Sequence, residues 1–113
     1  MSDPSLAFQY IPDLAGLVTE IAPDSIVSRT FYRDERLKAI LFGFAPGQEL
    51  SEHTSAVPAA LQIISGEAVV TLGDERFEAQ AGAWAHMAAR LPHSIVAKTE
   101  VVMLLWMFTD AAK

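Results

Sequence analysis

The chain has no cysteine among its 113 residues. This absence excludes a disulfide and a thiolate metal site within the chain, because both need the cysteine sulfur. The folded state must therefore be held together by its apolar core, without covalent cross-links.

Long apolar runs and basic runs are missing as well. The longest apolar stretch, residues 101–108, is much shorter than the roughly 20 residues that cross a bilayer. The opening stretch MSDPSLAFQY lacks the basic segment and the apolar run of a signal peptide. We therefore expect a cytoplasmic protein with no membrane partner.

Positive charge is scarce. Eight lysines and arginines stand against fourteen aspartates and glutamates, which gives a formal net charge of −6. Proteins that bind nucleic acids normally present a basic face to the phosphates, and no basic run is present here. We expect no nucleic-acid partner.

Apolar residues are abundant, at 51% of the chain against 19% charged residues. A chain of this length forms one domain with one core. The apolar surplus predicts either a lined cavity that takes a small-molecule ligand or a subunit interface. A homodimer is the simplest assembly that would cover such an interface.

Short strands dominate the pattern from Ser25 onward, while residues 13–21 match a short helix with Asp13 as its N-cap. The sequence predicts an all-β, single-domain fold, with an N-terminal extension at residues 1–25 and a β-barrel at residues 26–110. The expected strands are residues 26–32, 37–44, 61–65, 67–72, 75–79, 84–88, 94–97 and 101–108.

Two segments resemble the paired motifs of the cupin superfamily. In the first, Gly47 is followed after five residues by His53, and the closing glycine is Gly66. In the second, Gly82 precedes His93 by eleven positions, with Pro92 just before the histidine. The resemblance implies a small conserved-barrel cupin, an RmlC-like jelly roll that is often dimeric and has a pocket at one end.

In a complete cupin site, three histidines and a glutamate hold a divalent Fe, Mn, Ni, Zn or Cu ion. The resemblance assigns His53 and His93 to the first and last ligand positions. The second histidine position is Ser55 and the glutamate position is Ala59, neither of which is an adequate ligand. The inherited metal set is therefore incomplete, since catalytic metals normally keep three protein ligands.

Gln62 is the nearest candidate for a replacement ligand. In the family register, Ala59 and Leu61 face the cavity and Gln62 faces away, unless a bulge at Pro58 reverses the alternation. By the same alternation His86 points outward or into a dimer contact. We include Gln62 with His53, Ser55 and His93 as candidate pocket residues.

The sequence is compatible with three functions. The first is a small-molecule binder whose metal site is weak or absent, with few polar groups in an apolar pocket. The second is a metal-dependent oxygenase or isomerase that acts on a small organic acid or aromatic compound. In that second case, without a metal, the histidines could serve as general base and acid. The third is a purely structural module.

Overall fold

The structure is a computed structural model that describes residues 7–109. Its helical content within that range is one 3-10 turn, η1 (Leu14–Leu17). The strands are β1 (Ile26–Arg33), β2 (Leu37–Phe44), β3 (Glu49–His53), β4 (Ala59–Ser65), β5 (Glu67–Leu72), β6 (Glu75–Gln80), β7 (Trp84–Met87), β8 (His93–Ala97) and β9 (Val101–Phe108). The expected all-β class is confirmed.

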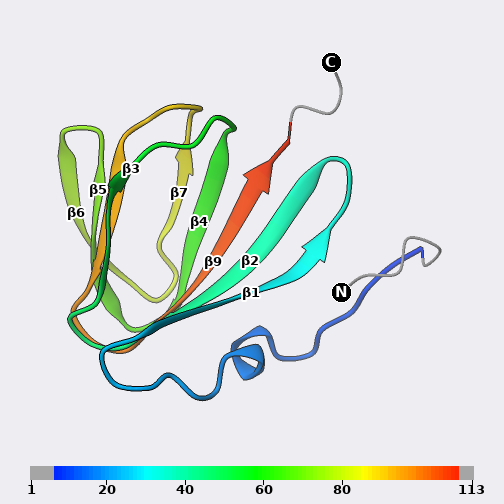
Figure 1. Ribbon diagram of the computed structural model, residues 1–113, viewed down its shortest axis with the longest axis horizontal. Coiled ribbons are helices and arrows are strands. Elements are labelled where there is room, and N and C mark those ends of the chain that lie inside the picture. The colour runs from blue at the N-terminus through cyan, green and yellow to red at the C-terminus, as the bar shows by residue number, and fades with distance from the viewer. Residues whose placement is uncertain (1–6, 110–113) are drawn as a thin grey trace.

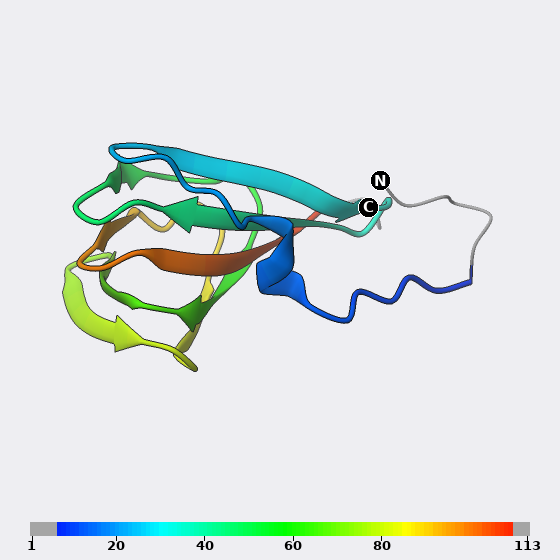
Figure 2. The ribbon, with the colours of Figure 1, turned by 90° about the horizontal axis from the view of Figure 1, so that it is seen from below.

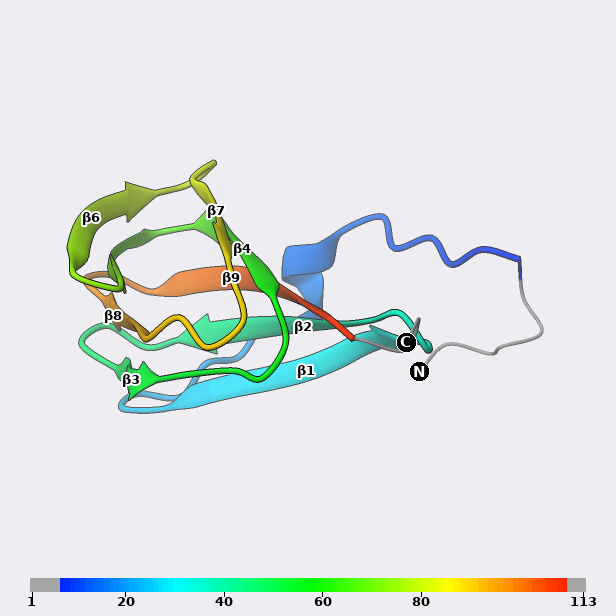
Figure 3. The ribbon, with the colours of Figure 1, turned by 90° about the horizontal axis from the view of Figure 1, so that it is seen from above.

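The strands form two antiparallel sheets that face each other (Figures 1 and 2). The five-stranded sheet has the order β1-β2-β9-β4-β7, and the four-stranded sheet has the order β3-β8-β5-β6. Consecutive strands repeatedly change sheets, as in a jelly roll. Figure 3 shows the edge strands β6 and β7 of the two sheets on the same side of the barrel.

Strand alternation divides the apolar residues between the inside and the outside of the barrel. On β4, Ala59, Leu61 and Ile63 point into the main core between the sheets. That core also contains Phe44 and Met103 from neighbouring strands. Because successive side chains point to opposite faces, the residues between them lie on the outer face of the sheet.

A second apolar cluster covers part of this outer face. Leu41 and Leu104 of the sheet pack there with Val18, which follows η1. The N-terminal segment thus shields one region of the five-stranded sheet, and Figure 2 shows it crossing that sheet.

The N-terminal segment is short and mostly irregular, and the helix expected at residues 13–21 is reduced to a single 3-10 turn. Only the four residues of η1 are helical, and Asp13 makes no capping hydrogen bond through its side chain. Gly16 and Pro23 both disfavour a longer helix, and so short a segment gains little from helical hydrogen bonds. Packing of its apolar residues onto the sheet decides its path instead.

The structure contains one strand, β3, that the sequence pattern did not predict. Four of its five residues are exposed, so it carries little of the alternation that identifies a strand. It is an edge strand that pairs with β8, and its register shifts between Leu50 and His53. Pairing with β8, rather than its own composition, makes this segment extended.

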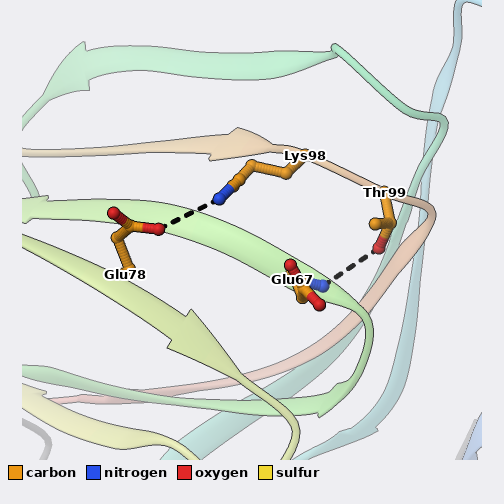
Figure 4. A network of polar contacts seen from close by, with 4 residues as sticks. All are labelled: Glu67, Glu78, Lys98 and Thr99. Atoms are coloured by element: carbon orange, nitrogen blue, oxygen red, sulfur yellow. Dashed lines mark hydrogen bonds and ion pairs between the residues drawn. The ribbon is translucent and has the colours of Figure 1, made fainter.

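A polar network joins β5, β6 and the turn after β8 (Figure 4). Lys98 Nζ lies 3.0 Å from Glu78 Oε1, and the Glu67 backbone N–H donates to Thr99 Oγ1 at 3.0 Å. The hydrogen bond from Lys98 lowers the pKa of the Glu78 carboxyl, and the same bond raises the pKa of Lys98. The described residues contain no helix long and apolar enough to cross a membrane.

Candidate functional site

The two motif histidines come together on the four-stranded sheet. His53 ends β3 and His93 begins β8, and the two residues are direct partners in the antiparallel register. On β8, Ile95 and Ala97 belong to the main core, so His93 points the same way, into the barrel. His53 shares that face, because directly opposed residues carry their side chains on one side of a sheet.

The two imidazole rings are in contact, with centroids 4.2 Å apart and planes at 61°. Nδ1 of His53 donates to the carbonyl oxygen of Ser51 at 2.8 Å, and Nδ1 of His93 donates to that of Leu91 at 2.8 Å. A carbonyl only accepts, so each Nδ1 carries a proton. In the neutral form, each Nε2 is then a hydrogen-bond acceptor.

Both Nε2 atoms are available to a ligand. Neither has a hydrogen-bond partner among residues 7–109. His93 is 8% exposed, yet no buried side-chain nitrogen or oxygen in the described part of the chain lacks a partner. The unpaired Nε2 of His93 must therefore border open space rather than a sealed apolar wall.

Ser55 lies in the loop between β3 and β4, where its hydroxyl and its carbonyl both accept hydrogen bonds. Its hydroxyl oxygen accepts the backbone N–H of Val57 at 3.2 Å, and its carbonyl accepts the N–H of Arg90 at 2.7 Å. These bonds close a turn next to the site. They give Ser55 a structural role there.

The structure does not bring Gln62 together with the histidines. Gln62 is opposite Trp84 on one side and Leu104 on the other, on the outer face of the five-stranded sheet. Pro58 does not reverse the alternation, because the register shift on this strand comes later, between Ile63 and Ser65. A bulge at Pro58 would have been needed to turn Gln62 inward.

His86 also lies on the outer face. It pairs with Ala60 and is exposed, so its ring is on the opposite side of the sheet from the cavity. The alternation of Ala85 and Met87 predicted this outward orientation, and the register agrees with it.

These residues do not fit the metal of a complete cupin site. No group of three histidine, cysteine, aspartate or glutamate side chains is close enough to hold a metal ion within residues 7–109. Ala59 faces inward between Met87 and Met107, so thioethers and a methyl group stand beside the glutamate position. Two neutral imidazoles and apolar neighbours would leave the charge of a divalent ion uncompensated.

The sequence indicated an apolar cavity but not its location, which in the structure is between the edge strands β6 and β7. Its volume is about 330 Å³, and Trp84 and Glu78 also contribute to its wall. The inward-facing residues that line it are Leu61, Val70, Leu72, Phe77, Ala79, Ala83 and Ala85. The signal in the sequence was the set of small residues on β6 and around β7, which leave this side of the barrel unfilled.

Comparison with known proteins identifies the fold. A family model described as the Cupin domain matches residues 40–108. The structure is similar to a cupin superfamily protein from Desulfitobacterium hafniense, with a TM-score of 0.81 and 25% identity over 90% of this chain and 94% of the other. It is also similar to a conserved protein of unknown function from Streptococcus pyogenes, with a TM-score of 0.77 and 28% identity over 92% and 90% of the two chains.

A salicylate 1,2-dioxygenase from Pseudoaminobacter salicylatoxidans, solved as adducts with gentisate, shares the fold as well. The TM-score is 0.70 and the identity is 13%, over 77% of this chain and 26% of the enzyme. At that identity the likeness concerns the fold alone. The search among curated proteins found no match.

Proposed function

The chain belongs to the cupin family, and from this premise we propose that it binds a small organic molecule inside its barrel. His53 and His93 hold the polar end of that molecule. The observation that carries the proposal is the pair of touching imidazoles whose Nδ1 atoms are both bound to backbone carbonyls. This arrangement fixes the rings and leaves two Nε2 atoms for a ligand.

The chemistry of the pair favours a ligand that donates hydrogen bonds. Two Nε2 acceptors side by side suit a hydroxyl group, a pair of neighbouring hydroxyls or an amine. Hydrogen bonds of this kind orient a ligand in a mainly apolar pocket, where they supply specificity. We therefore propose a small molecule with a hydroxyl or similar donor at one end.

Phenol tests this function, with anisole as the matched probe that lacks the O–H donor. We expect phenol to shift the Nε2 resonance of at least one of the two histidines in long-range ¹H–¹⁵N spectra, and anisole to leave both in place. Phenol has one O–H and donates to one Nε2 at a time, so replacing the accepting histidine, by His53→Ala or His93→Ala, should weaken phenol binding by about three- to tenfold, the effect of one hydrogen bond worth ~0.5–1.5 kcal/mol.

His86→Ala is the matched control, since this histidine is exposed on the outer face of the barrel. It should bind phenol as tightly as the unmodified protein does. The proposal fails if phenol leaves both Nε2 resonances unchanged, or if the His86 variant loses as much affinity as the variants of the pair.

We also propose that the chain acts as a homodimer in the cytoplasm. In support, apolar side chains stand exposed on the outer face of the five-stranded sheet, among them Trp84 at 59% and Phe108 at 37%. Light scattering during size exclusion should give twice the 12.3 kDa mass of one chain.

Phe108→Glu should reduce that mass to one chain, because it places a charge in the proposed contact. The control is Phe77→Ser, which alters an exposed phenylalanine of the other sheet and should keep the dimer. A single-chain mass at every concentration of the unmodified protein would refute the dimer.

A further inference from the structure

We infer that the cavity between β6 and β7 holds a flat apolar body of about two fused rings, which belongs to the same ligand whose hydroxyl meets the histidines. This inference rests on the proposed function and extends it to the substrate class, a fused-ring aromatic alcohol.

The size of the cavity sets the size of the body. Its volume of about 330 Å³ is roughly twice that of an engineered cavity of ~150 Å³ that binds benzene. It also falls at the lower end of the ~300–1,000 Å³ range of small-molecule sites. One ring would leave it half empty, whereas two fused rings would fill it.

The wall chemistry favours an uncharged aromatic body. Val70 and Leu72 of β5 and Phe77 of β6 form one wall, and Leu61 and Ala85 form the other. Aromatic rings pack well against Phe77, since offset or edge contacts between rings add to the gain from burial.

Glu78, the charged residue at this wall, is directed elsewhere. It alternates with the inward-facing Phe77 and Ala79, and its carboxylate lies 3.0 Å from Lys98 Nζ. The Glu78 carboxylate is therefore paired with Lys98 on the outer side of β6. The interior of the cavity is therefore left to apolar contacts.

The cavity lies next to the histidine pair, so one ligand can reach both. Leu72 lines the cavity and is also the direct register partner of His93 between β5 and β8. Neighbouring strands are about 5 Å apart, so the cavity on β5 and β6 begins one strand away from the imidazole pair. A rigid molecule about two rings long would span that separation.

The cavity also opens to the side of the barrel. Phe77, whose side chain faces inward, is 47% exposed, so its ring stands at the rim of the cavity. Figure 3 shows β6 and β7 as edge strands of different sheets on this side of the barrel, and the two do not pair with each other. This seam provides a route by which the ring body reaches the interior.

The test compares 2-naphthol with phenol by calorimetry, because the two probes share the hydroxyl and differ by one fused ring. We expect 2-naphthol to bind about tenfold more tightly, since the second ring buries additional apolar area. Ala79→Leu and Ala85→Leu each insert a larger side chain into the cavity. Each should reduce the affinity for 2-naphthol to about the affinity of the unmodified protein for phenol.

Ala22→Leu is the control, because it makes the same substitution at an exposed residue of the N-terminal segment. In the unmodified protein, nuclear Overhauser contacts between 2-naphthol and the ring of Phe77 provide a second readout if the cavity variants do not fold.

The outcomes separate the inference from the proposed function. If 2-naphthol and phenol bind equally well, or if 2-naphthol makes no contact with the Phe77 ring, the ring body lies elsewhere and the inference is overturned. The proposed function survives that result as long as phenol still shifts the histidine resonances. If neither probe reaches the histidines, both are overturned.

Discussion

Gly66→Ala is expected to destabilise the protein by about 3 kcal/mol or more, a large fraction of the ~5–15 kcal/mol that stabilises a typical domain. Gly66 joins β4 to β5 with φ +92°, a conformation that costs other residues ~1–3 kcal/mol. A Cβ at this position would lie 2.1 Å from the carbonyl oxygen of Glu100. That oxygen belongs to the backbone, so relieving the overlap requires the turn before β9 to move.

The hydrogen bonds around this turn resist such a movement. The Glu67 carbonyl accepts the backbone N–H of Lys98 at 2.8 Å, and the Glu67 N–H donates to Thr99 Oγ1 (Figure 4). Displacing Glu100 would disturb this junction between β5 and the end of β8. Urea denaturation of Gly66→Ala, compared with the unmodified protein, measures the loss.

Gly82→Ala is the control for the backbone conformation alone. Gly82 has φ +97°, but a Cβ there would meet no atom within 4 Å. It should cost only the backbone strain of ~1–3 kcal/mol, and therefore less than Gly66→Ala. Equal losses for the two variants would show that the Glu100 carbonyl imposes no additional penalty.

Phe44→Ala is expected to cost about 3–5 kcal/mol, because it removes a fully buried aromatic ring and leaves a cavity. Phe44 is 0% exposed, points into the main core from β2, and has its ring centroid 6.1 Å from that of Phe42. Its loss should lower the midpoint of urea unfolding sharply.

Phe8→Ala makes the same truncation in the N-terminal segment, where the ring is 79% exposed. It should cost clearly less, since the space that it vacates stays open to water. If the two variants lose equal stability, the core between the sheets does not dominate the folding free energy.

The proposed site of the two histidines keeps its geometry without a full set of metal ligands. Each ring is held through Nδ1 by a carbonyl of its own strand or loop, so its orientation does not require a metal. In metal sites a carbonyl or carboxylate on the second ring nitrogen plays the same orienting part. Here the same kind of hydrogen bond from Nδ1 leaves the two Nε2 atoms as acceptors beside an apolar cavity.

Local pattern in the sequence was enough for much of the barrel. The β-branched and aromatic runs predicted most strands, because alternation with period two records which face of a sheet is buried. The spacing of Gly47, His53 and Gly66, and that of Gly82 and His93, was enough to indicate the cupin family. The outward orientation of His86 followed from alternation alone.

Pairing between distant segments decided what local pattern could not. The exposed strand β3 exists because β8 pairs with it, and that pairing places His53 against His93 across 40 positions of sequence. The register of β4 against β7 and β9 put Gln62 outside the barrel, since a slip of one residue would have reversed its face.

The sequence by itself therefore determined the fold class, the family and the two histidines. The tertiary structure decided which Nε2 atoms stay available, why Gly66 admits no side chain, and where the cavity between β6 and β7 lies. The physical reason is that alternation and turn propensity act over a few residues. Cavities, ring contacts and steric exclusion arise only where strands far apart in the chain are brought side by side.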